Sequence, residues 1–304
     1  TFVPLRAIFE AVGASVIWDQ DTLTALATKA QEDNKEGSSV VVQINNSTDA
    51  IVICGTTGEA STMTEEEHME VIKKCCEYVN KRIPVIAGTG SNCTETAIKL
   101  SKEAQEVGAD ALLVVTPYYN KATQKGLIQH YSAIAQAVDL PIIMYNVPGR
   151  TGCNIQPATA VEIAKKNANV VAIKEASGNI SQVAKLAQLA DGCIDIYSGN
   201  DDQVVPLLSL GGKGVISVVS NLDPFLTNAM TQAALKGADN TALKLQHQLW
   251  PLLQALSSDI NPIPIKEALK IIGYDCGGCR LPLTKLSDDK NKILKESIFA
   301  LQQG

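Results

Sequence analysis

One pattern repeats along this sequence from residue 49 to residue 219. A short apolar run is followed by a turn and an amphipathic segment, and then the next apolar run begins. The runs are continuous and rich in Val and Ile, as in strands that are buried on both faces of a parallel sheet. They span residues 49–54, 83–87, 110–116, 140–145, 169–175, 193–198 and 214–219. Seven such units in series predict an α/β fold, the (β/α)8 TIM barrel.

The eighth strand of this barrel must precede the repeat, and residues 22–28 (TLTALAT) are the good candidate for it. The competing α/β fold is a doubly wound open sheet. Its glycine-rich dinucleotide turn after the first strand is absent from the sequence, so the barrel is favoured.

Local signals mark several of the helices between the strands. Thr64 and Glu67 have the spacing of a capping box at a helix start, and Gly108 has the position of a helix end. After residue 221 the pattern is helical throughout, over 223–236, 240–258, 263–273 and 285–302. We therefore expect three parts: an atypical N-terminal segment (1–24), a barrel with a divergent first βα unit (25–236), and a C-terminal helical region (237–304).

Composition excludes several classes of protein. Of the 304 residues 45% are hydrophobic and 19% charged, which is typical of a globular chain, and the net charge is −6. No Lys/Arg-rich run is present, so neither nucleic acid nor an anionic membrane is an expected partner. We expect no transmembrane helix and no secretory signal in the first 30 residues. The eight scattered cysteines indicate reduced thiols and a cytoplasmic protein rather than a disulfide framework.

The predicted strands end in polar and glycine-rich stretches, and the carboxyl ends of barrel strands carry the active site. These stretches are 55–59 (GTTGE), 88–90 (GTG), 116–119 (TPYY), 145–150 (YNVPGR), 174–175 (KE), 198–201 (SGND) and 216–217 (IS).

Lys174 is the most informative residue, because it lies near the end of an otherwise apolar strand. Burial of an ammonium group is costly, so the pKa of this lysine should fall. A neutral amine there is a nucleophile for carbonyl groups, which predicts a Schiff-base lysine. The alternative is a structural ion pair with Glu175. Adjacent residues of a strand point to opposite faces, which disfavours that pair.

Four other residues can complete such a site. The Tyr145 phenol can relay protons to and from a lysine adduct, and Thr57 and Tyr119 can extend this relay by hydrogen bonds. The alternative for Tyr145 is a tyrosine that packs at the rim of the barrel. Backbone N–H groups at Thr56 and Thr57 can bind a carboxylate, and so can the Arg150 guanidinium, unless it is an ordinary surface arginine.

No metal is expected. His68, His130 and His247 are far apart in sequence and fall on predicted helices. Cys276 and Cys279 have the spacing of metal ligands, but no second Cys/His pair lies at zinc spacing from them, so we expect a surface loop there.

Seven motifs, in order and at consistent spacing, give this chain a resemblance to a known family from about residue 40 to its end. They are GTTGE (55–59), AGTG (87–90), TPYYN (116–120), YNVPGRT (145–151), IKEASG (173–178), SGND (198–201) and GGKGVIS (211–217). The chain resembles the pyruvate-dependent class I aldolases of the dihydrodipicolinate synthase / N-acetylneuraminate lyase family, and within it the synthase branch. The alternative is an N-acetylneuraminate lyase or a sugar-acid (2-keto-3-deoxy) aldolase, and these usually lack an arginine at the position of Arg150.

The resemblance implies a Schiff base between Lys174 and pyruvate, with no other cofactor. It implies condensation with L-aspartate-4-semialdehyde to 4-hydroxy-tetrahydrodipicolinate, in lysine and diaminopimelate biosynthesis. Tyr145, Thr57 and Tyr119 would form the proton relay, with Tyr119 supplied across a dimer interface of a homotetramer.

The resemblance also implies the residues that bind the substrates. Thr56 and Thr57 would hold the pyruvyl carboxylate, and Arg150 would hold the carboxylate of the aldehyde. Gly199 and Ile216 would line the pocket through their backbones.

The N-terminus departs from the family pattern. Residues 25–28 (ALAT) fit part of the family's first strand, but Lys29 stands where the family has proline. Residues 1–24 instead resemble a copper-amine-oxidase N-terminal-like repeat, without copper ligands. A barrel that kept its fold but lost catalysis, or a surface module, would be the non-enzyme alternatives. The presence of Lys174 and Tyr145 disfavours the first of them.

Overall fold

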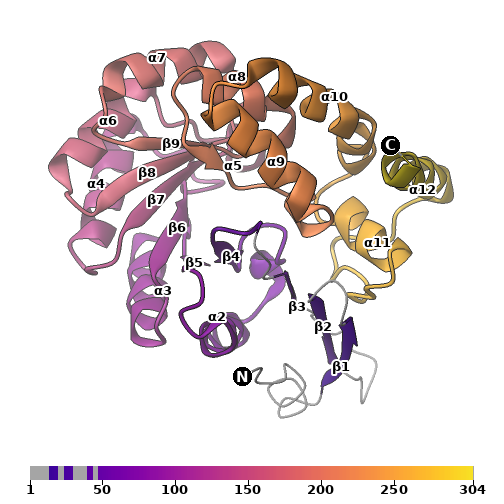
Figure 1. Ribbon diagram of the computed structural model, residues 1–304. Coiled ribbons are helices and arrows are strands. Elements are labelled where there is room, and N and C mark those ends of the chain that lie inside the picture. The colour runs from indigo at the N-terminus through magenta and orange to yellow at the C-terminus, as the bar shows by residue number, and fades with distance from the viewer. Residues whose placement is uncertain (1–13, 20–23, 30–39, 44–46, 304) are drawn as a thin grey trace.

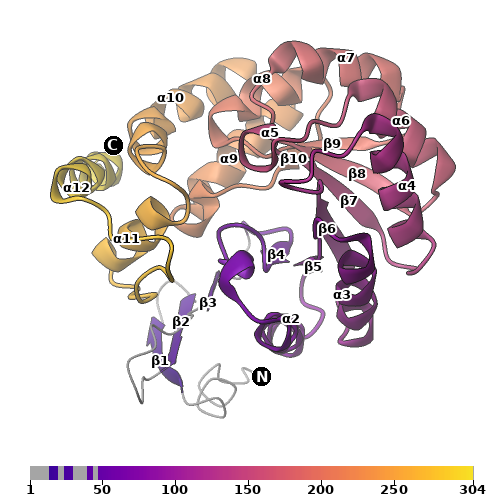
Figure 2. The same cartoon turned by 180° about the vertical axis from the view of Figure 1, so that it is seen from behind.

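The computed structural model describes residues 14–19, 24–29, 40–43 and 47–303. Its centre is a seven-stranded sheet in the order β10-β9-β8-β7-β6-β5-β4, and every pair in it is parallel. The strands are β4 (Ile51–Ile53), β5 (Val85–Gly88), β6 (Ala111–Val115), β7 (Ile142–Asn146), β8 (Val170–Glu175), β9 (Asp195–Ser198) and β10 (Gly214–Val215). Each of the seven predicted apolar runs overlaps one of these strands, and β5 and β7 each extend one residue beyond the predicted run. The sheet curls into a half-barrel, with helices along its outer side (Figures 1 and 2).

Helices connect successive strands, as the repeat predicts. They are α2 (Glu65–Val79), α3 (Thr94–Glu106), α4 (Gln124–Ala135), α6 (Pro157–Lys166), α7 (Ile180–Ala190) and α8 (Val204–Ser209). Short turns of helix lie at η1 (Ala60–Thr62), α5 (Pro148–Thr151), η2 (Asp201–Gln203) and η3 (Val219–Asn221). The predicted capping box is present at the start of α2, where the Thr64 hydroxyl accepts from Glu67 N and the Glu67 carboxylate accepts from Thr64 N.

The main core lies between the sheet and these outer helices. Ile72, Leu112, Ile142 and Ile173 are completely buried there. Burial of an aliphatic side chain of this size contributes about 1.5–3 kcal/mol. The next residue on a strand points to the inner side, where Leu113 and its neighbours form a smaller apolar cluster. This alternation directs selected strand residues into the interior of the half-barrel.

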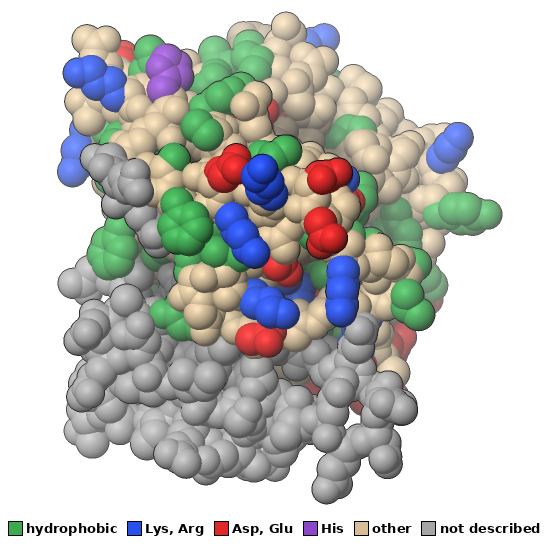
Figure 3. All heavy atoms as spheres, turned by 90° about the vertical axis from the view of Figure 1, so that its right-hand side faces the viewer, with side chains coloured by type: hydrophobic (Ala, Val, Ile, Leu, Met, Phe, Trp, Pro, Cys, Tyr) green, Lys and Arg blue, Asp and Glu red, His purple; other side chains and the backbone are tan. Residues whose placement is uncertain are grey.

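Four helices follow the last strand of the sheet: α9 (Pro224–Leu235), α10 (Asp239–Leu256), α11 (Ile263–Ile271) and α12 (Asp288–Gln303). A second apolar core joins them to α8, with Val204, Met230, Leu249 and Leu253 among its buried members. Acidic and basic side chains lie near one another on the described part of the face in Figure 3. Among the described residues no helix is long and apolar enough to span a membrane.

The prediction that residues 22–28 supply the eighth barrel strand is wrong for the part of the chain that the structure describes. Thr24–Lys29 forms β2, which pairs antiparallel with β1 (Ala14–Asp19) and β3 (Val40–Gln43) in a separate three-stranded sheet. Antiparallel neighbours close in sequence need only a short connection, whereas a parallel crossover needs a dozen residues or more. Within the described residues, β4 and β10 therefore remain the two edges of the parallel sheet.

Most of the atypical segment 1–24 lies outside the described residues, so its resemblance to an amine-oxidase repeat stays a prediction. The segment around Cys276 and Cys279 is a loop, as expected, but the expected surface position is wrong for Cys276, which is buried.

Candidate active site

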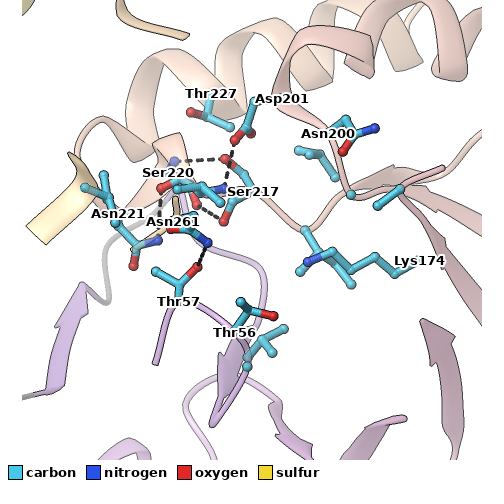
Figure 4. A pocket seen from close by; sticks show the side chains of 18 of the residues that line it. Thr56, Thr57, Lys174, Asn200, Asp201, Ser217, Ser220, Asn221, Thr227 and Asn261 are labelled. Carbon is cyan, nitrogen blue, oxygen red and sulfur yellow. Dashed lines mark hydrogen bonds between the residues drawn. The ribbon is translucent and has the colours of Figure 1, made fainter. Parts of the chain in front are cut away.

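The carboxyl ends of the strands border a cavity of about 1050 Å³. Seven of the eight residues selected from the sequence line it: Thr56, Thr57, Tyr145, Arg150, Lys174, Gly199 and Ile216. They come from the ends of β4, β7, β8, β9 and β10, or from the loops that follow these ends. Strands far apart in the sequence meet here because parallel strands all end at the same rim. Figure 4 shows Lys174, Thr56 and Thr57 around this space.

Lys174 and Tyr145 are paired in register on the neighbouring strands β8 and β7. The lysine Nζ lies 4.4 Å from the centroid of the tyrosine ring. Burial lowers the pKa of Lys174 from 10.5 to about 8. The negative charge of Asp201 opposes this shift, and the positive charge of Arg150 adds to it. A substantial fraction of the amine is therefore neutral near pH 8, and a neutral amine can attack a carbonyl carbon.

The wall beside Lys174 accepts only glycine at position 199. A Cβ atom on Gly199 would lie 2.8 Å from the Lys174 Cε and 2.7 Å from the Ala176 Cβ. The backbone N–H of Gly199 donates to Glu175 O at 2.8 Å, which holds this turn against the end of β8. The missing side chain therefore leaves room for the lysine to extend into the cavity.

Glu175 is not the partner of Lys174. Its carboxylate accepts from Ser177 N at 2.7 Å, from Asn146 Nδ2 at 3.0 Å and from Gln182 Nε2 at 3.4 Å. These partners lie on the outer side of the sheet end, as expected for the strand neighbour of an inward-pointing residue. The structural ion pair considered as an alternative for Lys174 is therefore absent from the described residues.

Tyr145 is buried, with 8% of its surface exposed. Burial raises the pKa of its phenol, while the nearby Arg150 charge and a hydrogen bond with Thr56 act in the opposite direction. The phenol thus stays protonated at neutral pH and can donate a proton, and the phenolate that is left can take a proton back from a more acidic group.

Thr57 and Arg150 are connected through a residue that the sequence did not single out. Asn261, in the loop between α10 and α11, donates from Nδ2 to the Thr57 Oγ1 at 2.9 Å (Figure 4). Its backbone oxygen accepts from Arg150 Nη2 at 3.2 Å. Asn261 precedes Pro262 at a helix start, which is a weak local signal, and it is 204 positions from Thr57.

The GTTGE loop is also held by a buried ion pair. Lys266 Nζ lies 2.6 Å from the Glu59 Oε2, and the side chains are only 10% and 9% exposed. Lys266 donates in addition to Gly278 O at 2.7 Å, and the other Glu59 oxygen accepts from Arg280 N at 2.9 Å. The C-terminal region thus fixes the loop that carries Thr56 and Thr57.

Asp201 is a further ionisable group on the cavity wall. Its Oδ2 accepts from the backbone N–H groups of Val218 and Val219, at 2.9 and 3.1 Å. Burial raises the pKa of this carboxyl group, and these hydrogen bonds and the charge of Lys174 oppose the rise. In sequence it appeared only as the last residue of the SGND motif.

Tyr119 is the selected residue that the structure does not bring to this cavity. Its side chain is 89% exposed, and its backbone has the left-handed φ of 73°. Its N–H donates to Thr151 O at 3.2 Å, so the backbone is tied to the turn after β7, and the residue is not among those that line the cavity of its own chain.

Two of the histidines make local contacts in the outer layer. His68 bonds through Nε2 to Gly88 O at 2.7 Å, and His130 bonds through Nδ1 to the Thr94 hydroxyl at 2.9 Å. Over the part of the chain that the structure describes, no cluster of three potential metal ligands occurs.

Comparisons with known proteins extend these observations. The model of the dihydrodipicolinate synthetase family matches residues 22–301. A 4-hydroxy-tetrahydrodipicolinate synthase from Lachnoclostridium phytofermentans is 57% identical over 264 residues, which cover 87% of this chain and 90% of the relative. Another from Acetivibrio thermocellus is 48% identical over 293 residues, with 96% and 97% covered.

Solved structures agree with the sequence matches. The crystal structure of dihydrodipicolinate synthase from Aquifex aeolicus superimposes with a TM-score of 0.83 at 42% identity, covering 84% of this chain and 88% of that one. The resemblance inferred from the seven motifs is thereby confirmed. The chain belongs to the dihydrodipicolinate synthetase family.

Proposed function

We propose that this protein is a 4-hydroxy-tetrahydrodipicolinate synthase, a lyase that condenses pyruvate with L-aspartate-4-semialdehyde in lysine and diaminopimelate biosynthesis. One observation carries the proposal: the amine of the half-buried Lys174, whose pKa is lowered, faces the ring of the buried Tyr145 in a cavity that Arg150 also lines. The similar proteins described above are named 4-hydroxy-tetrahydrodipicolinate synthase, which supports the same reaction.

The lysine supplies the covalent step. The neutral Nζ of Lys174 adds to C2 of pyruvate, and the carbinolamine loses water to give an iminium ion. Loss of a proton from C3 then gives an enamine, and its carbon attacks the aldehyde carbon of the second substrate. The amino group of that substrate attacks C2, closes the ring and releases Lys174 with its electron pair. The imine is the electron sink, so this route assigns no role to a metal.

The Tyr145 phenol transfers the protons in this sequence. It donates to the oxygen that leaves as water and accepts a proton in the reverse direction, and the lysine amine 4.4 Å from the centre of its ring supports this role. The hydrogen bond with Thr56 connects the phenol to the GTTGE loop, and Thr57 extends the same polar chain.

Two groups of residues bind the two carboxylates. Thr56 and Thr57 hold the pyruvate carboxylate next to Lys174, and the backbones of Gly199 and Ile216 complete the pocket. Arg150 is exposed on the loop after β7, where its guanidinium can bind the aldehyde's carboxylate in a bidentate manner.

Tyr119 acts in the site of a neighbouring subunit under this proposal, within a homotetramer. Its exposure of 89% and its position outside the cavity of its own chain support this role. If Tyr119 lies at a subunit contact, Tyr119→Asp weakens the assembly and lowers turnover, and sedimentation velocity measures the change. An unchanged assembly state would contradict the role.

We also propose that residues 237–304 form a helical region that supports the barrel domain through Asn261, Lys266 and Arg280. A cytoplasmic location is part of the proposal as well. The free thiols of Cys54, Cys75, Cys76, Cys93, Cys153 and Cys193 support it, since reduced cysteines persist in a reducing compartment.

The choice of aldehyde distinguishes this function from that of the sugar-acid aldolases in the same family. With pyruvate present, we expect turnover of aspartate semialdehyde and none of N-acetylmannosamine. Arg150→Leu should raise the KM for aspartate semialdehyde by about 10–100-fold, the loss of one charge-assisted hydrogen-bonding group. Turnover of N-acetylmannosamine in place of aspartate semialdehyde would contradict the proposal.

A further inference from the structure

We propose that Asn261 is a positioning residue, which sets the direction of the Thr57 hydroxyl and so the affinity of the site for the pyruvate carboxylate. This inference rests on the function proposed above. It concerns a residue on the loop between α10 and α11, outside the strand ends that carry the other site residues.

The hydrogen bond between the two side chains determines where the Thr57 proton points. A hydroxyl group has one proton and two acceptor lone pairs, whereas an amide nitrogen can only donate. Because Asn261 Nδ2 donates to the Thr57 Oγ1 at 2.9 Å, a lone pair of this oxygen is used and its proton stays free. Both residues line the cavity, so that proton can be donated to a carboxylate there.

The Asn261 amide has this orientation although its oxygen forms no hydrogen bond with the described residues. The Asn261 Oδ1 is buried and has no hydrogen-bond partner among the described residues. A buried carbonyl oxygen without a partner is unfavourable for stability. The unpaired Oδ1 thus indicates that this amide orientation serves the hydrogen bond from Nδ2 to Thr57 rather than the stability of the loop.

Neighbouring contacts hold Asn261 in place relative to Thr57. Five residues further on, Lys266 forms the buried ion pair with Glu59, two residues after Thr57. The backbone oxygen of Asn261 also accepts from Arg150 Nη2. The loop is therefore fixed to the GTTGE segment on one side and to the arginine on the other, so Asn261 couples the two carboxylate-binding groups.

Two substitutions separate this role from simple packing. Asn261→Asp keeps the size of the side chain, but its carboxylate accepts from the Thr57 hydroxyl, turns the proton away from the substrate and adds a negative charge. Asn261→Ala removes the contact and leaves the hydroxyl free to rotate. Positioning predicts that the isosteric Asp variant is the weaker binder, whereas a packing role predicts that the Ala variant is.

The experiment measures the pyruvate concentration that gives half-maximal borohydride trapping, together with KM and kcat, on the full chain. We expect that concentration to rise about tenfold in Asn261→Ala and about 100-fold in Asn261→Asp, with kcat at saturating pyruvate changed less than about threefold. Asn240→Ala is the matched control, since Asn240 is exposed near the start of α10 and does not line the cavity. It should behave as the wild type.

A double-mutant comparison tests whether the effect passes through Thr57. In a Thr57→Val background, Asn261→Ala should raise the half-maximal concentration less than about twofold further. A full additional effect, or an Asp variant that binds pyruvate better than the Ala variant, would overturn the inference and leave the proposed function intact. If the folded wild type gives no adduct at all, the proposed function fails and this inference fails with it.

Discussion

The amine of Lys174 and the ring of Tyr145 face each other across two adjacent parallel strands, with Nζ 4.4 Å from the ring centroid. Each residue is the second to last of its strand, and the other inward residues of both strands are apolar, so Tyr145 is buried and Lys174 half-buried. This burial has consequences for pH dependence, for substitution at each position and for stability.

The rate of pyruvate adduct formation should rise with pH around the pKa of Lys174. That pKa is lowered to about 8, so the reactive neutral form gains population as the pH increases from 7 to 9 and saturates above. This rate is measured at a series of pH values by stopping the reaction with borohydride after set times and quantifying the adduct. A rate that is flat across this range, in a protein that stays folded, would show that deprotonation of this amine does not limit the reaction.

Lys174→Met should abolish the adduct and leave the free energy of unfolding equal or higher. The folded-state pKa lies below the unfolded value, so burial disfavours the charged form, and below pH 8 this lysine lowers stability. An apolar side chain of similar length removes that penalty. Urea unfolding at pH 7 measures the change, and a loss of several kcal/mol would mean that the lysine has a structural role instead.

Tyr145→Phe keeps the ring beside Lys174 but removes the phenolic proton. We expect kcat to fall by about 10²–10⁴-fold, the usual contribution of a positioned acid–base group. The pyruvate concentration for half-maximal trapping should change little, because the carboxylate-binding groups are untouched. Steady-state kinetics and the time course of trapping, which should be slowed, check this prediction. A near-normal kcat would show that Tyr145 does not transfer the protons.

Gly199→Ala should block the extended position of Lys174. The added methyl group would lie 2.8 Å from the lysine Cε, closer than carbon atoms approach without displacement. Trapping of pyruvate should then fall strongly in a protein that still folds. Gly126→Ala, on α4, is the control, since its methyl group meets its nearest neighbour, the Thr123 hydroxyl, at 3.4 Å. Equal trapping in both variants would contradict the packing described for this wall.

Lys266→Met should destabilise the protein by about 3–5 kcal/mol, because it leaves the buried Glu59 carboxylate without its counter-charge. The double variant Glu59→Gln/Lys266→Met should recover much of this loss. Lys166→Met provides the comparison, since its pair with Glu162 is exposed, and it should cost less than about 1 kcal/mol. Similar costs at both lysines, by urea unfolding, would argue against a structural role for the buried pair.

The parallel sheet and much of the site could be predicted from the sequence because both depend on local patterns. Apolar runs bounded by turns predicted β4 to β10, and a lysine at the end of such a run could be recognised without a structure. The antiparallel sheet of β1 to β3 was missed because residues 22–28 read equally well as either kind of strand, and pairing direction is not encoded within one strand.

Contacts between segments that are distant in sequence also could not be predicted. Asn261 and Thr57 are separated by 204 positions, and Lys266 and Glu59 by 207. No periodicity links such residues, since only the folded chain brings the loop after α10 to the end of β4. The site residues that were found lie at or just after strand ends, whereas Asn261 and Lys266, which were missed, approach from the C-terminal region.

The central claim is that Lys174 forms a Schiff base with pyruvate. Incubation of the wild-type chain with pyruvate and borohydride, followed by intact mass and peptide mapping, tests it most directly. We predict one reduced pyruvyl group on the peptide that contains Lys174, and none in Lys174→Met. A folded protein that gives no adduct, or an adduct on another lysine, would contradict the account.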